Sequence, residues 1–388
     1  MNTETKKRRR KGARTQVDGL VEQIFGGEVH APRVASMSQG VDGVLHAAAL
    51  GIRAIGHGLA AANGLTPRHA IKPVDRLLSN PKMSRDERLR CWVKFVVGER
   101  KDLDVNCDWT EFEESDQSMS VLGTQTEHGR STPLVWKTVT RSKLKDQRNA
   151  HEAALRCKLA ALRPAGVRIT VVADRGFSAT TRYRFLTEDR GCHAIIRFRG
   201  VVQVEAAQGE RRKAKEWLGV GGRMRVLRHA RVTALSEPGP VVVGVQAKAR
   251  KEPWRLVSSR SDLLGAALKR ADGTRCTVEE TVRDVKHPRL GLGLQQTVIE
   301  RHDRRDVLFL LAVLAHTLLT LLGQAGQALG MERWLGGTRP GPYALFRQGQ
   351  RLFDLIPTMD KGRLRKLLTR FDQLLREHAL LSQVLGYL

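Results

Sequence analysis

The stretch RITVVADRG, residues 168–176, decides the fold of this chain. After Arg168 come five apolar or β-branched residues, and they lead directly into Asp174. A continuous run of this kind is typical of a strand that is buried on both faces of a parallel sheet. Taken alone, Asp-Arg-Gly after a strand is also typical of a structural turn, so the role of Asp174 depends on the rest of the chain.

The segments on either side of this strand predict an α/β fold. We expect three short strands and a long helix before it, and a helix and a buried strand after it: residues 103–108, 118–123, 133–139 and 144–162, then 179–189 and 193–199. Three strands, a helix, a strand, a helix and a strand is the order of the ribonuclease H-like fold.

The remaining segments flank or interrupt this core. Residues 15–100 look helical, and the apolar residues near their start recur at helical spacing: Val17, Leu20, Val21 and Ile24. Residues 200–261 hold short β-prone pieces between Gly, Pro and charged turns, which predicts a β-rich insertion. From residue 262 the chain returns to helix, with a Gly/Pro-rich break at residues 336–342.

Charge is the strongest compositional signal. Lys and Arg number 67 against 40 Asp and Glu, a net charge of +27. Such an excess indicates a polyphosphate partner, although a basic structural or ribosome-associated protein would share it. The positive charge is spread along the chain rather than gathered on one amphipathic helix, which argues against binding to a membrane surface. A basic cluster at residues 6–11 reads as an arm that lies along phosphates.

The cysteines and the most apolar segment exclude other classes. Five scattered cysteines without a CxxC pair argue against a disulfide framework and a zinc site, and they fit a reducing cytoplasm: Cys91, Cys107, Cys157, Cys192 and Cys276. The apolar run at residues 307–322 is shorter than the roughly 20 residues that a membrane span needs, and it contains His316. We expect a buried core helix there.

A helix-turn-helix is a second candidate for nucleic-acid contact. A small-residue helix over residues 52–62 ends at Asn63-Gly64, and Thr66 with Pro67 begins the next helix. Arg68, His69 and Lys72 would then face outward. The same pattern fits a plain αα-hairpin, and Pro73 should kink its second helix.

Three carboxylates stand where a metal site would need them. Cutting a phosphodiester requires an activated water and charge stabilisation, which a pair of divalent ions held by carboxylate oxygens can provide. Asp108 lies at the end of the first predicted strand, Asp174 follows the apolar strand, and Glu279 lies in a helical segment over residues 277–286.

The sequence around these carboxylates resembles the insertion-sequence-four family of DDE transposases. The block VVADRGFSATTRYRFLTEDRGCHAIIRFRG resembles its Asp-Arg-Gly-Phe block, and CDWTEF is similar to its Asp-Trp-Thr. RCTVEETVRDVKHPRLGLGL is similar to its Y-R-E-K signature, with Arg275 four residues before Glu279 and Lys286 seven after it.

The resemblance implies an enzyme that cuts transposon ends and joins the 3′-hydroxyl to target DNA. Asp108, Asp174 and Glu279 would be catalytic and hold Mg²⁺, for which Mn²⁺ can substitute. Double-stranded DNA would be the partner and a homodimer the active assembly. The residues that would contact DNA are Arg275, Lys286, Arg175 and Trp254, with Trp217 as the other candidate to receive a flipped base.

The resemblance also gives each region a role. Residues 1–100 would be a helical DNA-binding region, 101–199 and 262–330 the ribonuclease H-like catalytic core, and 200–261 the β-rich insertion. The helical residues 331–388 would be a candidate dimer interface, and the protein would be cytoplasmic and associated with the nucleoid.

Several assignments have competitors within the chain. Asp102 and Asp104 compete with Asp108, and Glu280 with Glu279. Asp272 stands where the signature has Tyr; we expect it either to oppose a DNA phosphate or to be a solvated turn residue. Two other functions stay open: an impaired transposase copy that only binds DNA, and a nuclease of the same fold without strand transfer.

Overall fold

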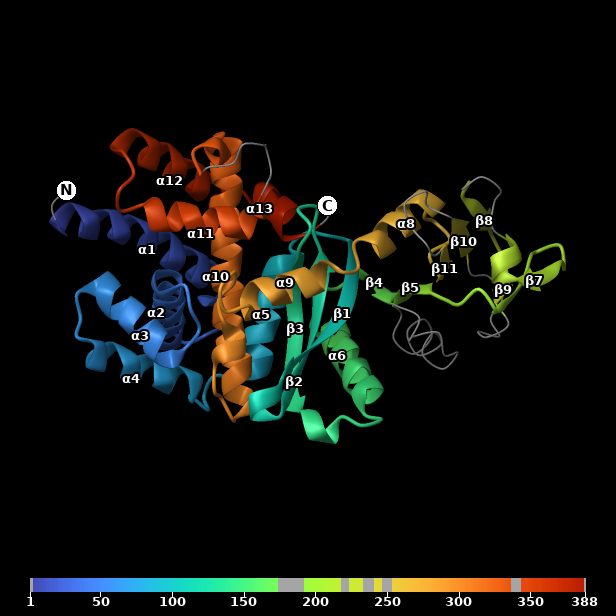
Figure 1. The fold of residues 1–388 in the computed structure, drawn as a ribbon, viewed down its shortest axis with the longest axis horizontal. Coiled ribbons are helices and arrows are strands. Elements are labelled where there is room, and N and C mark those ends of the chain that lie inside the picture. The colour runs from blue at the N-terminus through green and yellow to red at the C-terminus, as the bar shows by residue number, and fades with distance from the viewer. Residues whose placement is uncertain are drawn as a thin grey trace. The chain divides into compact units, whose positions relative to one another are not determined.

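The computed structural model describes residues 3–173, 192–217, 223–232, 241–245, 253–335 and 343–386. It is a mixed α/β structure (Figure 1). The chain divides into two compact units. The first unit consists of Met1–Gly98, Asp108–Arg163 and Val278–Leu388, and the second of Glu99–Cys107 and Pro164–Thr277.

The first unit begins with five helices: α1 (Thr3–Phe25), α2 (Ala31–Ala47), α3 (Ile52–Asn63), α4 (Pro67–Leu78) and α5 (Arg85–Val97). The predicted apolar face of α1 is confirmed, because Val17, Leu20, Val21 and Ile24 are all buried. Gly64 ends α3 in the left-handed conformation, with a φ of 68°, which glycine adopts without strain. On α4, Arg68, His69 and Lys72 are exposed, as expected, and the helix continues through Pro73.

The helix α10 (His302–Ala328) forms the core of the first unit. Its most apolar window is long and apolar enough to cross a membrane, and all of it is buried inside the protein, which agrees with the predicted core helix. The pair α2 and α3, bent by 93°, passes the same test of length and composition. Around α10 pack α2, α4, β3 (Ser131–Thr140) and the later helices α11 (Leu345–Leu355), α12 (Lys361–Arg376) and α13 (His378–Leu385) (Figure 1).

A long hairpin completes the first unit. Strands β2 (Gln117–Gln125) and β3 (Ser131–Thr140) pair antiparallel, and α6 (Arg148–Leu162) packs against both. The helix α9 (Thr277–Lys286) belongs to this unit from Val278 onward. Short 3-10 turns lie at Glu113–Ser115, Arg141–Lys143, Leu294–Gln296 and Met331–Arg333.

Parallel strands form the centre of the second unit. Strand β4 (Arg168–Ala173) has the bounds that its apolar run predicts, and it pairs parallel with β1 (Asp102–Phe112) and with β5 (His193–Arg197). Five of its six residues are buried, because neighbours cover both faces. Within the second unit the strand order of the main sheet is β1-β4-β5-β11-β10-β8, and within the first unit β2 lies between β3 and the end of β1.

The strands after residue 200 divide between two sheets. Strands β8 (Arg225–Leu227), β10 (Val241–Val245) and β11 (Trp254–Ser258) extend the main sheet antiparallel beyond β5. The sequence of β10, VVVGV, is apolar throughout, and all five of its residues are buried in the sheet. Only β6 (Gln203–Glu205), β7 (Arg211–Lys213) and β9 (Arg231–Val232) pair in a small sheet of their own, followed after β7 by a 3-10 turn at Ala214–Trp217.

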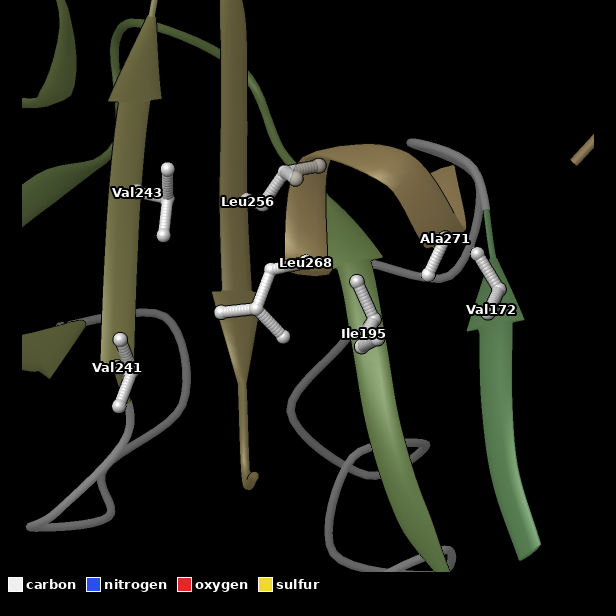
Figure 2. Close-up of a cluster of buried hydrophobic side chains, with 7 residues drawn as sticks. All are labelled: Val172, Ile195, Val241, Val243, Leu256, Leu268 and Ala271. Atoms are coloured by element: carbon white, nitrogen blue, oxygen red, sulfur yellow. The ribbon is translucent and has the colours of Figure 1, made fainter. Parts of the chain in front are cut away.

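The helix α8 (Gly265–Gly273) packs on β4, β5, β10 and β11 of the main sheet. Figure 2 shows Leu268 and Ala271 of α8 over apolar side chains from four strands: Val172, Ile195, Val241, Val243 and Leu256. The predicted helix over residues 179–189 and the break at residues 336–342 lie outside the described residues, as do Asp174 and Arg175.

Candidate active site

The start of β1 holds two acidic residues, Asp102 and Asp104, that interact with arginine in the second unit. The Asp102 carboxylate accepts hydrogen bonds from Arg260 Nη1 at 2.9 Å and from Arg168 Nη2 at 2.7 Å. Burial raises the pKa of the Asp104 carboxyl, and Arg260 and a hydrogen bond from Thr170 oppose that rise. Both acids are therefore committed to contacts within the second unit, which favours Asp108 over them as a metal ligand.

Asn106 connects β1 to the segment between α8 and α9. It lies on the same face of the strand as Asp104 and Asp108, because side chains of a strand alternate between its faces. Asn106 is fully buried, and its amide nitrogen donates to the main-chain oxygen of Arg275, in the link between α8 and α9. The Arg275 side chain is half-buried.

In the first unit, Lys286 holds the end of α9 against the end of β1. Its Nζ donates to the main-chain oxygen of Glu111 at 2.7 Å and lies 5.5 Å from the centroid of the Phe112 ring. Burial lowers the pKa of Lys286, and the carboxylates of Glu111, Glu113 and Asp108 partly offset that effect. The charge of Asp108 therefore acts on the same helix that carries Glu279.

The adjacent acids Glu279 and Glu280 differ in their partners. Glu280 lies 3.9 Å from Arg130 and accepts a hydrogen bond from Arg283. Glu279 is exposed, and no hydrogen bond or ion pair to its carboxylate is found within the described part of the chain. Seven residues separate Glu279 from Lys286, close to two full turns, so both lie along one side of α9.

The third predicted ligand, Asp174, lies outside the described residues. The last paired residues of β1 and β4 are Asn106 and Val172. Asp108 and Asp174 each stand two residues further along their own segments. Among the residues that the structure describes, no three His, Cys, Asp or Glu side chains are grouped so that they could hold a metal ion.

Both expectations for Asp272 are wrong. Its side chain is fully buried and forms an ion pair with Arg197, so it neither opposes a phosphate nor lies in a solvated turn. The helix α8 continues through Asp272 to Gly273, where a turn was expected. Burial of a carboxylate requires a partner of opposite charge, which Arg197 supplies from the end of β5.

The two candidate tryptophans are both buried. Trp254 is 8% exposed, and the cations of Arg197 and Lys269 lie 5.4 and 5.5 Å from its ring centroid. Trp217 is 4% exposed, and its indole nitrogen donates to the Val204 oxygen at 3.2 Å. A flipped base could stack on Trp254 only after these cations moved aside, and this role stays a prediction.

Sequence reasoning missed the residues that hold α9 from its inner side. Arg130, Asp284 and His316 form a connected polar group there: Arg130 Nε lies 2.5 Å from the Asp284 carboxylate, and His316 Nε2 lies 3.4 Å from it. The one available signal was His316, a polar residue in the middle of the most apolar segment. Arg130 and Asp284 carry no such signal, because charged residues near a turn or on a helix usually face solvent.

The chain was compared with known protein families and with curated proteins. Residues 127–318 match the model of a family described as "Transposase DDE domain". A search of curated proteins found no match. The matched stretch contains Glu279, Lys286 and Arg130, and Asp108 precedes it. A DDE transposase domain implies a ribonuclease H-like core, DNA as partner and phosphoryl transfer as the chemistry, and such domains generally use divalent metal ions.

Proposed function

We propose that this protein is a DNA transposase of the insertion-sequence-four group, which cuts transposon ends and joins the 3′-hydroxyl to target DNA. The observation that carries the proposal is the match to a DDE transposase domain over the segment with the Arg275, Glu279 and Lys286 spacing. The contact of Lys286 with Glu111 supports it, because this contact joins the helix of Glu279 to the strand of Asp108.

The donor set fits a hard divalent cation. Asp108 and Glu279 offer carboxylate oxygens, which Mg²⁺ and Mn²⁺ prefer, and Glu279 is exposed on its helix. Asp174 completes the set in this proposal, because its sequence surroundings resemble the Asp-Arg-Gly-Phe block of the insertion-sequence-four group. When bound, the ions would activate water and stabilise charge on the attacking and leaving oxygens.

The other residues of this site act on the protein and on DNA. Asn106 fixes the main chain of Arg275, and Lys286 fixes the end of α9 against β1. We infer that Arg275, Arg175 and Lys286 bring positive charge to the terminal phosphates, and that Trp254 contributes only if its ring becomes exposed. The net charge of +27 and the exposed cations Arg68 and Lys72 on α4 support binding along the DNA backbone.

Two further parts of the proposal concern assembly. Two DNA ends must be held together for strand transfer, so we propose a homodimer that forms through the helices of residues 331–388. The helical residues 1–100 would contribute DNA binding through α3 and α4. These helices pack closely on each other, as both a helix-turn-helix and an αα-hairpin would.

One experiment separates the proposal from its alternatives. The purified protein is incubated with Mg²⁺, a target plasmid and labelled DNA that carries both ends of the element around its gene. Cleavage that leaves a 3′-hydroxyl, followed by joining to the plasmid, is the expected result. Cleavage without joining would indicate a nuclease, and binding without cleavage would indicate an impaired copy that acts as a DNA-binding protein.

A further inference from the structure

We propose that Arg130 is a positioning residue, which holds α9 so that Glu279 keeps its direction. The meaning of that direction rests on the proposed function, in which Glu279 is a metal ligand. The contact by which Arg130 holds α9 does not rest on that function, because its effect can be measured on the protein without DNA or metal.

The contact between Arg130 and α9 has two points. Arg130 Nε lies 2.5 Å from Asp284 Oδ2, and Nη2 lies 3.4 Å from Oδ1, so the guanidinium grips both carboxylate oxygens. Its Nη1 also lies 3.9 Å from Glu280. The Arg130 and Asp284 side chains are 15% and 11% exposed, so water screens this pair only weakly. Arg130 therefore spans one turn of α9, from Glu280 to Asp284.

A tight turn places Arg130 for this contact. The main-chain nitrogen and the hydroxyl of Thr126 both donate to the Arg130 oxygen, at 3.1 and 2.6 Å. Gly129 between them has a φ of 77°, where a side chain would cause strain. Hydrogen bonds within the turn between β2 and β3 thus fix the main chain at Arg130, from which its side chain extends.

Two neighbouring contacts reinforce the hold. The Thr281 hydroxyl donates to the Ser131 oxygen and accepts from the Ser131 nitrogen, both at 2.8 Å. His316 of α10 lies 3.4 Å from the same oxygen, Asp284 Oδ2, and its ring stacks on Phe346 with centroids 4.6 Å apart. Burial alone would raise the pKa of Asp284, but His316 and Arg130 together bring it below its ordinary value.

The direction of Glu279 follows from this arrangement. Glu280, Thr281 and Asp284 lie on the held side of α9. Glu279 is displaced from Glu280 by about 100° around the helix axis. A rotation or loosening of α9 after loss of Arg130 would move the Glu279 carboxylate along an arc, and metal ligands tolerate little displacement.

The contact requires arginine at position 130, because the planar guanidinium binds both carboxylate oxygens of Asp284 in a bidentate manner. A lysine keeps the charge but offers a single ammonium, which cannot grip both oxygens of Asp284. Arg130→Lys should therefore retain part of the hold, and Arg130→Gln should lose it. Arg283→Gln is the matched control, since Arg283 also pairs with Glu280 but its side chain is 62% exposed.

Hydrogen exchange of the α9 amides tests the hold directly. We expect Arg130→Gln to speed exchange in α9 by about tenfold or more, Arg130→Lys by less, and Arg283→Gln not at all. Asp284→Asn, which keeps the shape of the side chain, should resemble Arg130→Gln and guards against misfolding of one variant. Unchanged α9 exchange in both folded variants would overturn the proposal.

Magnesium titration then tests the consequence for Glu279. In the cleavage assay, Arg130→Lys should raise the Mg²⁺ concentration for half-maximal rate by about tenfold while DNA affinity stays the same. Faster α9 exchange with an unchanged Mg²⁺ requirement would show that Arg130 supports the helix without positioning Glu279, and would refute the proposal. If the unaltered protein cleaves no DNA, the proposed function fails, and hydrogen exchange still decides whether Arg130 holds α9.

Discussion

Two buried aspartates on consecutive helices show how similar ion pairs serve different ends. Asp272 of α8 pairs with Arg197, whose guanidinium also lies against Trp254, beside the apolar cluster under α8. Asp284 of α9 pairs with Arg130 and holds the helix that carries Glu279. The pair of Asp272 and Arg197 contributes to packing within the second unit. The pair of Asp284 and Arg130 supports the helix of a candidate active-site residue. A sequence pattern alone therefore did not distinguish the buried, ion-paired Asp272 from an exposed acid such as Glu279.

The largest expected effect concerns Glu279, which belongs to neither of these ion pairs. Glu279→Gln should reduce Mg²⁺-dependent cleavage by about a thousandfold, because loss of a metal ligand removes several kcal/mol of charge stabilisation. Glu280→Gln should retain most activity, since Glu280 is already paired with arginines. Cleavage rates of the two variants on the same DNA end make the measurement. Equal losses would mean that the partners of the two acids do not distinguish their roles.

The second effect would break the pair at Asp272. The variant Asp272→Tyr, which introduces the residue of the signature that this segment resembles, should lower the free energy of unfolding by about 3–5 kcal/mol, because Arg197 would lose its buried partner. Urea unfolding measures this. The double variant Asp272→Leu with Arg197→Met should recover much of the stability, since an apolar pair needs no ionic partner. Tighter DNA binding by Asp272→Tyr without loss of stability would contradict the buried pair.

A third buried aspartate shows the limit of arginine pairing. Asp306 of α10 accepts from Thr138 and has Arg85 at 3.6 Å, yet burial raises its pKa to about 6. A raised carboxyl pKa stabilises the fold fully below the unfolded value near 4, and this stability is lost as the pH rises through about 6. The loss is about 3 kcal/mol. Asp306→Asn should remove it, as unfolding measured between pH 4 and pH 7 would show; an unchanged pH profile would refute the shift.

His128 should act in the opposite direction over the same range. Burial lowers its pKa to about 4, and the charges of His316 and Arg130 add to this, against a hydrogen bond to the Val384 oxygen. The unfolded chain then binds a proton before the folded chain does, so stability falls as the pH drops from about 6.5 to about 4. His128→Gln should make the protein less sensitive to acid, whereas Asp306→Asn should make it more so. Parallel profiles for the two variants would contradict this opposition.

The smallest effect concerns Lys286, whose charge is shared between protein and DNA. Lys286→Ala should reduce the slope of log affinity against log salt concentration by about 0.9 or less, the value for one phosphate contact. Part of its charge already serves the Glu111 oxygen, which is why we expect no more. Binding to the element's end at several salt concentrations measures the slope. An unchanged slope and affinity would show that Lys286 only joins α9 to β1.

Local patterns predicted the elements whose stability is local. The apolar run before Asp174 predicted the bounds of β4, and helical spacing predicted the buried face of α1. The same patterns could not show that β8, β10 and β11 extend the main sheet, because strand pairing joins segments that are far apart in sequence.

The sequence offered candidate acids for the site but not the contacts around them. Asp108, Asp174 and Glu279 stand in recognisable sequence surroundings. Asp272 was misjudged because LKRADGTRC reads as a polar turn, and its partner Arg197 is 75 residues away. Arg130 and Asp284 are 154 residues apart, and only the fold brings them together.

The position of α10 in the chain has a consequence for how the protein is made. This helix leaves the ribosome after α2, α4 and β3 but before α11, α12 and α13, all of which pack on it. For the few seconds that synthesis of the later helices takes, at about 5–20 residues per second, a segment apolar enough to cross a bilayer lacks the cover of α11, α12 and α13. In that interval the nascent chain competes between folding, aggregation and capture by membrane-insertion machinery. The yield of soluble protein in a host cell should therefore depend on how quickly residues 345–385 follow.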